Sequence, residues 1–80
     1  MVETRRAPRF RVAMPAQIEC RGDTIPCVIR NISTTGAALQ LQESTDRIPV
    51  AFALTILGSA QKLPCRVVWR APFRIGVMFV

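Results

Sequence analysis

The sequence contains no histidine and no tyrosine, and its three cysteines, Cys20, Cys27 and Cys65, form no CxxC pair. Without histidine these thiols cannot complete a zinc site, and the commonest general acid–base residue is missing. The five carboxylates are scattered without a recognisable pairing, and Ser33 has no histidine to activate it. We therefore expect a protein that is not an enzyme, uses no cofactor and holds no metal ion.

Long hydrophobic runs are also missing. The longest, residues 48–57, is too short to cross the roughly 30 Å of a bilayer's hydrocarbon core as a helix. The early arginines are not followed by the apolar stretch of a secretory signal. An odd number of widely spaced cysteines favours free thiols in a reducing compartment over disulfides. These absences predict a cytoplasmic protein that does not insert into a membrane.

What remains is a small, apolar and basic chain. It has 80 residues, of which 50% are hydrophobic, and a formal net charge of +6. That length predicts one domain over residues 1–80, and that hydrophobic content is too high for a disordered tail. The positive charge favours polyanionic partners such as nucleotides, nucleic acid or an anionic surface.

Apolar and polar residues alternate along most of the chain, which is typical of half-buried β-strands. Six such segments fit between residues 10 and 79, with turns or polar loops around residues 21–23, 31–36, 43–49, 58–59 and 71–73. We predict an all-β fold, a small six-stranded antiparallel barrel, because closure of the sheet removes exposed edges. The alternation places Phe10, Val50, Trp69 and all three cysteines on the buried side.

Four arginines, Arg5, Arg6, Arg9 and Arg11, lie within seven residues before and at the start of the first strand. Pro8 disfavours a helix here, and residues 1–8 are predicted to form a flexible, arginine-rich arm. The planar guanidinium group can bond in a bidentate manner to phosphate oxygens and to guanine. A solvated arm that only keeps the protein soluble is the alternative interpretation.

The loop of residues 31–36 offers an amide, several hydroxyls and a glycine between two strands. As a plain turn, it would use Asn31 and Ser33 to cap backbone groups, with Gly36 at positive φ.

Together, Arg5-Arg6-x-x-Arg9 and Asn31-x-Ser33-x-x-Gly36 resemble the bipartite RxxxR and [D/N]xSxxG signature of PilZ domains, which bind the bacterial second messenger cyclic di-GMP. The closing segments, residues 67–69 and 76–79, also resemble the final hairpin of that family. The resemblance covers nearly the whole chain and implies a PilZ-like barrel and six ligand-binding residues: Arg5, Arg6, Arg9, Asn31, Ser33 and Gly36.

In these terms, Arg5 and Arg9 would grip guanine edges and phosphates, and Arg6 would help to neutralise the ligand. Asn31 stands at the Asp/Asn position without a carboxylate's charge, which affects affinity. Many members of the family continue into a C-terminal helix, whereas this chain stops at Val80. A second copy could cover the barrel end that such a helix would cover, and we therefore expect a homodimer.

The leading hypothesis is a cyclic di-GMP receptor whose arm becomes ordered on the ligand and so signals to an unknown protein partner. The family resemblance implies control of motility, pili, biofilm or exopolysaccharide synthesis. One alternative is a PilZ-like interaction module without nucleotide binding. Another is a basic barrel for single-stranded nucleic acid, with Phe10, Trp69 and Phe73 as stacking surfaces. This partner is disfavoured because the alternation buries Phe10 and Trp69.

Overall fold

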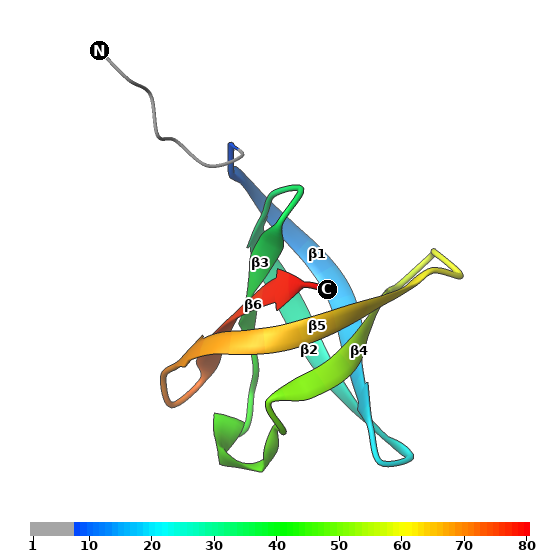
Figure 1. Ribbon diagram of the computed structural model, residues 1–80, viewed down its shortest axis with the longest axis vertical. Helices are drawn as coiled ribbons and strands as arrows, with labels where there is room; N and C mark the ends of the chain where they lie inside the picture. The colour runs from blue at the N-terminus through cyan, green and yellow to red at the C-terminus, as the bar shows by residue number, and fades with distance from the viewer. Residues whose placement is uncertain (1–7) are drawn as a thin grey trace.

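The computed structural model describes residues 8–80, which fold into a closed antiparallel barrel with the strand order β1-β2-β3-β6-β5-β4 (Figure 1). The all-β, six-stranded barrel predicted from the alternation is confirmed. The strands are β1 (Phe10–Cys20), β2 (Asp23–Ile32), β3 (Gly36–Gln40), β4 (Ala51–Ile56), β5 (Lys62–Arg70) and β6 (Arg74–Phe79).

The turn between β1 and β2 shows how local sequence starts the fold. Cys20 pairs with Asp23, so that only Arg21 and Gly22 form the loop. Both have positive φ, 52° and 81°. Two such residues are what a type I′ turn requires, and the twist of that turn matches the twist of the two strands. Gly22 accepts this conformation without strain, whereas Arg21 does so at some cost.

The interior is filled by aliphatic side chains from all six strands and the loop between β3 and β4. Ile18, Ile29, Leu39, Leu54 and Ile75 are completely buried. Two of the three free thiols join this core, because Cys27 and Cys65 are buried, while Cys20 is half-buried. Burial raises the pKa of Cys27 to about 12 and that of Cys65 to about 11, so both thiols stay protonated at neutral pH.

Three side chains predicted to be buried are exposed. Trp69 is 47% exposed because β5 has a bulge between Val67 and Trp69, and the extra residue turns Trp69 from the inner to the outer face. Phe10 is 63% exposed at the start of β1, where the described residues do not cover it. Val50 is 61% exposed because it precedes β4 instead of lying within it.

Helical structure within residues 8–80 is limited to one 3₁₀ turn, η1 (Thr45–Arg47), which lies in the segment 43–49 predicted as a turn or polar loop. The Ser44 hydroxyl accepts a hydrogen bond from the Asp46 amide at 3.2 Å and so begins this turn. β6 ends at Phe79 without a following helix. Across the part of the chain that the structure describes, we find no helix long and apolar enough to cross a membrane.

Candidate functional site

The two halves of the sequence signature meet on the barrel wall. The Arg9 guanidinium donates a hydrogen bond from Nη1 to Oδ1 of Asn31 at 2.7 Å, across 22 positions of sequence. The pairing of β1 with β2 makes this contact, since Arg11 lies opposite Asn31 and Phe10 opposite Ile32. The start of β1 therefore holds Arg9 beside the end of β2.

Ser33 closes the loop between β2 and β3 and does not face solvent. Its hydroxyl oxygen accepts hydrogen bonds from the amides of Thr35 at 3.1 Å and Gly36 at 3.2 Å. Its own amide donates to the Gly36 carbonyl at 2.8 Å, and the side chain is buried. The loop is shorter than the sequence predicts, because Asn31 belongs to β2 and Gly36 to β3. Ser33 thus fixes the conformation of the turn that joins the two strands.

Gly36 is required for a reason other than the predicted positive φ, which it does not have. A Cβ at this position would lie 2.2 Å from the carbonyl oxygen of Val77 on the neighbouring strand β6. Only a residue without a side chain allows β3 and β6 to approach this closely. Gly36 therefore acts through strand packing.

A row of paired residues runs across five strands on the outer face. Trp69 pairs with Gly76, Gly76 with Ala38, Ala38 with Asn31, and Asn31 with Arg11. Their sequence neighbours on β3 and β6 are core residues, so the row points outward. A Cβ on Gly76 would lie 2.1 Å from Nε1 of Trp69, which shows that the indole ring lies directly over this glycine.

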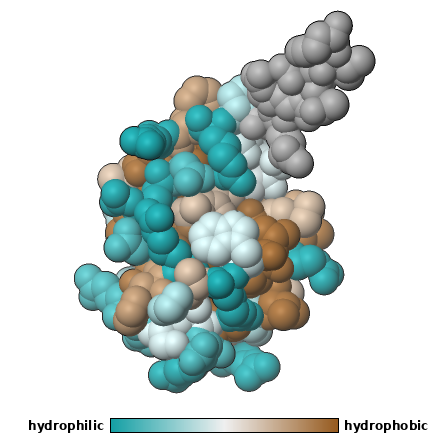
Figure 2. Space-filling view, turned by 90° about the vertical axis from the view of Figure 1, so that its left-hand side faces the viewer, coloured by the Kyte–Doolittle hydropathy of each residue, from teal (hydrophilic) through white to brown (hydrophobic). Residues whose placement is uncertain are grey.

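An arginine-lined hollow lies at the Asn31 end of this row. It has a volume of about 350 Å³ and is lined by Arg11, Val12, Arg30, Asn31 and Arg74. Hydrophilic and apolar side chains lie next to one another on the face of β3 and β6 that Figure 2 shows. Three guanidinium groups around one hollow form a site that suits an anion.

Arg9, Asn31, Ser33 and Gly36 are thus brought together, whereas the predicted site residues Arg5 and Arg6 lie outside the described residues. The sequence did not single out Arg30 or Arg74 for the site, and it placed Trp69 in the core. Arg30 could have been suspected because it directly precedes Asn31. Arg74 and Trp69 reach this region through the register of β6 and the bulge in β5, which the sequence does not reveal.

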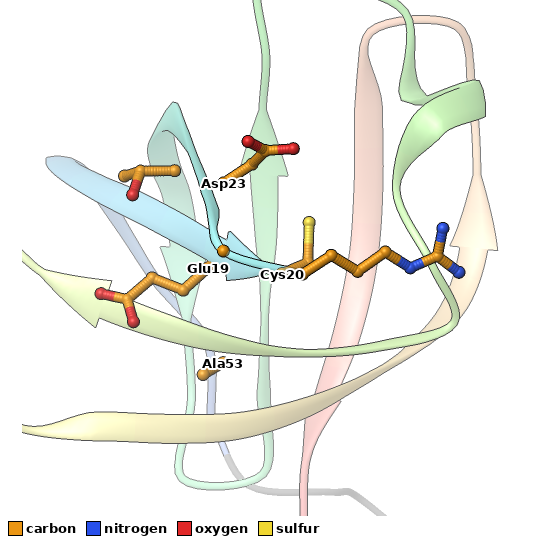
Figure 3. Close-up of a pocket in the computed structure, with 7 residues that line it drawn as sticks. Glu19, Cys20, Asp23 and Ala53 are labelled. Carbon is orange, nitrogen blue, oxygen red and sulfur yellow. The ribbon is translucent and has the colours of Figure 1, made fainter.

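A second hollow, of about 250 Å³, lies at the turn between β1 and β2, away from the start of β1 (Figures 1 and 3). Glu19, Cys20, Asp23 and Ala53 are among its lining residues. Figure 3 shows the carboxylates of Glu19 and Asp23 here. Its lining combines these two carboxylates with one guanidinium, that of Arg21, whereas the arginine-lined hollow has three guanidinium groups and no carboxylate and is the better candidate for an anionic ligand.

Comparison with known proteins supports the resemblance seen in the sequence. A family model described as "PilZ domain" matches residues 3–80. No curated protein matches the chain. Among solved structures, the barrel is similar to a crystal structure of an uncharacterized Legionella protein, with a TM-score of 0.58 and 22% sequence identity. The match covers 90% of this chain and 75% of the other, and at this identity it concerns the fold alone.

Proposed function

The chain belongs to the PilZ domain family, and from this premise we propose that it is a cyclic di-GMP receptor which binds the dinucleotide on its outer wall. The family consists of binding modules rather than enzymes. The observation that carries the proposal is the 2.7 Å hydrogen bond between Arg9 and Asn31, because it joins the two halves of the signature at one place.

The charges of the site suit this ligand. Cyclic di-GMP carries two phosphodiester charges, and the adjoining hollow presents Arg11, Arg30 and Arg74. Arg9 has five N–H donors, and within residues 8–80 it gives one of them to Asn31, so the described residues leave the other donors for a phosphate or a guanine edge. Asn31 therefore orients Arg9 for the ligand, and Ser33 acts indirectly by holding the loop that follows β2.

Trp69 offers a surface for a guanine base in the same proposal. Its exposed indole lies in the row of paired residues that ends at Asn31 and Arg11. Aromatic rings favour offset stacking on other flat π-systems, and a purine base is such a system. Arginines at one end of the row and an indole at the other fit a ligand with charged phosphates and flat bases.

Calorimetric titration of the intact protein with cyclic di-GMP tests this function. We expect saturable binding, and Arg9→Ala should weaken it at least about tenfold, because a hydrogen bond to a charged group is worth about 1.5–3 kcal/mol. Arg47→Ala is the matched control: it removes the same charge from η1, which lies at the other end of the molecule (Figure 1). Titration without saturable heat at micromolar ligand contradicts the proposal.

The steps after binding belong to the same proposal. The arm of residues 1–8, which includes Arg5 and Arg6, would become ordered on the ligand and present a new surface to a protein partner. Apart from Pro8, this arm lies outside the described residues. Control of motility, pili, biofilm or exopolysaccharide synthesis, the cytoplasmic location and the homodimer stay predictions. Sedimentation at tens of micromolar protein, with and without ligand, tests the homodimer.

Single-stranded nucleic acid gains support as a second candidate ligand from one observation. Phe10, Trp69 and Phe73 are 63%, 47% and 52% exposed, which removes the objection that such stacking surfaces are buried. Competition decides between the two ligands. Displacement of labelled cyclic di-GMP by unlabelled cyclic di-GMP, but not by an equal concentration of oligonucleotide, favours the receptor.

An interaction module without nucleotide binding predicts that Arg9→Ala leaves partner binding intact.

A further inference from the structure

The barrel leaves part of one strand edge without a neighbour. β1 pairs with β2 from Phe10 to Cys20, but it pairs with β4 only from Ala16 to Glu19. The Leu57 amide continues this contact by donating to the Pro15 carbonyl at 3.1 Å. Among the described residues, the side of Phe10–Met14 that faces away from β2 thus has no paired strand. In Figure 1 this part of β1 rises clear of the hairpin between β4 and β5.

The barrel has a second free edge, which differs from the first in its backbone donors. β2 pairs with β3 only from Val28 onward, so within residues 8–80 the segment Asp23–Cys27 also lacks an outer neighbour. Pro26 lies within that segment and has no N–H to offer an incoming strand. The β1 edge contains no proline between Pro8 and Pro15. Every residue of this edge therefore has a backbone N–H, and the N–H groups that point away from β2 can bond an incoming strand.

The side chains along the β1 edge are only partly covered. Val12 and Met14 are half-buried and pack against the core, while Phe10 is 63% exposed. A strand placed beside this edge would cover the remaining apolar surface of Val12 and Met14 with its own inward-facing side chains. The incoming segment should therefore be apolar at every second position.

Charge decides which segment fits. Arg11 lies on the edge and Arg9 directly precedes it, and both are exposed. These arginines keep the edge from pairing with copies of itself, because two such edges would bring like charges together. A second copy would also bring another net charge of +6. An acidic strand, in contrast, gains from both arginines.

We propose that Phe10–Met14 is a docking edge for an extended segment of a partner protein in which acidic and apolar residues alternate. The segment adds to the sheet beside β1, its backbone bonds to the free edge, its apolar side chains cover Val12 and Met14, and its carboxylates face Arg9 and Arg11. This inference goes beyond nucleotide binding. It uses Arg9 and Arg11, which the proposed function assigns to the dinucleotide, and its test is therefore made without nucleotide.

Backbone NMR of the full chain, without nucleotide, tests the docking edge. The probe is a short blocked peptide of alternating Val and Glu. Saturable shifts should centre on the amides of Phe10–Met14 and leave those of Asp23–Cys27 unchanged. The matched Val/Lys peptide should bind about fivefold more weakly or worse, because opposite charges across strands attract and like charges repel. A Val/Glu peptide with N-methylated backbone amides should not bind, because it cannot form the ladder.

Arg11→Glu should reverse the preference toward the Val/Lys peptide, and its amide spectrum shows whether the barrel is still folded. Three outcomes overturn the proposal: shifts that centre elsewhere, equal binding of both peptides, or unchanged binding of the N-methylated peptide. A fourth outcome, concentration-dependent protection of the Phe10–Met14 amides without any peptide, would also overturn it and assign this edge to a second copy.

Discussion

At the scale of single residues, the structure separates two roles within the signature. Arg9 and Asn31 place polar groups toward solvent, where a ligand can reach them. Ser33 and Gly36 are buried and act on the backbone, the first through its hydroxyl and the second through its missing side chain. A substitution at Ser33 or Gly36 would therefore change ligand binding through the shape of the loop.

Gly36→Ala should lower the free energy of unfolding by about 1–3 kcal/mol, the usual cost of inserting a carbon into a packed interior. The new Cβ would lie 2.2 Å from the Val77 carbonyl oxygen, so β3 and β6 must separate. Urea denaturation measures the loss. Thr34→Ala, at an exposed position in the same loop, is the control and should change stability by less than about 0.5 kcal/mol. Equal stabilities of Gly36→Ala and the wild type would show that the strands adapt freely.

At the scale of the strands, small irregularities decide which side chains face outward. The bulge in β5 brings Trp69 onto the outer wall, and irregular pairing around Arg30 lets Asn31 lie opposite both Arg11 and Ala38. Bulges also increase the local twist. The row from Trp69 to Arg11 thus depends on departures from regular alternation.

Strands β1, β4 and β5 are tied together by Glu19. Its carboxylate forms an ion pair with Lys62 at 2.9 Å and accepts a hydrogen bond from the Thr55 hydroxyl at 3.0 Å. The hydrogen bond from Lys62 and then that from Thr55 hold the pKa of Glu19 below its ordinary value of 4.5. The folded state therefore favours the ionised carboxylate, which stabilises the fold above that value.

This contribution should disappear as the pH falls from 4.5 through the lower pKa of the folded state, because the proton then binds the unfolded chain more tightly. Urea denaturation of the wild type and of Glu19→Gln, at about pH 7 and at about pH 3, measures it. The stability advantage of the wild type should be larger at the higher pH. An advantage that does not change with pH would assign the role of Glu19 to packing.

At the scale of the whole molecule, charge is the dominant feature. The chain carries a net charge of +6. The arginines of the candidate site lie on the outer wall of the barrel, whose interior is almost entirely apolar. Such a surface attracts anions over several ångströms and is screened by salt. Charge explains why an anionic ligand is favoured, but not which anion.

Binding of cyclic di-GMP should therefore weaken several-fold between about 50 mM and about 500 mM NaCl, where the screening length becomes shorter than the site. Calorimetric titration at a series of salt concentrations measures this trend. Arg9→Ala should give a shallower salt dependence than the wild type, and Arg47→Ala an unchanged one. An affinity independent of salt would mean that stacking, not charge, dominates recognition.

Much of this protein could be predicted from the sequence alone. Alternation specified six strands and an aliphatic core, since side chains on a strand change face at every residue. Gly22 marked a turn, and the spacing within residues 5–9 and 31–36 identified the two halves of the signature. These features are local, because each depends on residues that are neighbours in the chain.

Other features were decided only by the tertiary structure. The exposure of Trp69, the clash that requires Gly36 and the meeting of Arg74 with Arg30 all depend on how one strand pairs with another. Register and bulges are set by hydrogen bonds between strands that are distant in sequence, and one inserted residue turns every later side chain to the other face. The sequence therefore determined the strands and the signature, whereas strand pairing determined which side chains form the wall around them.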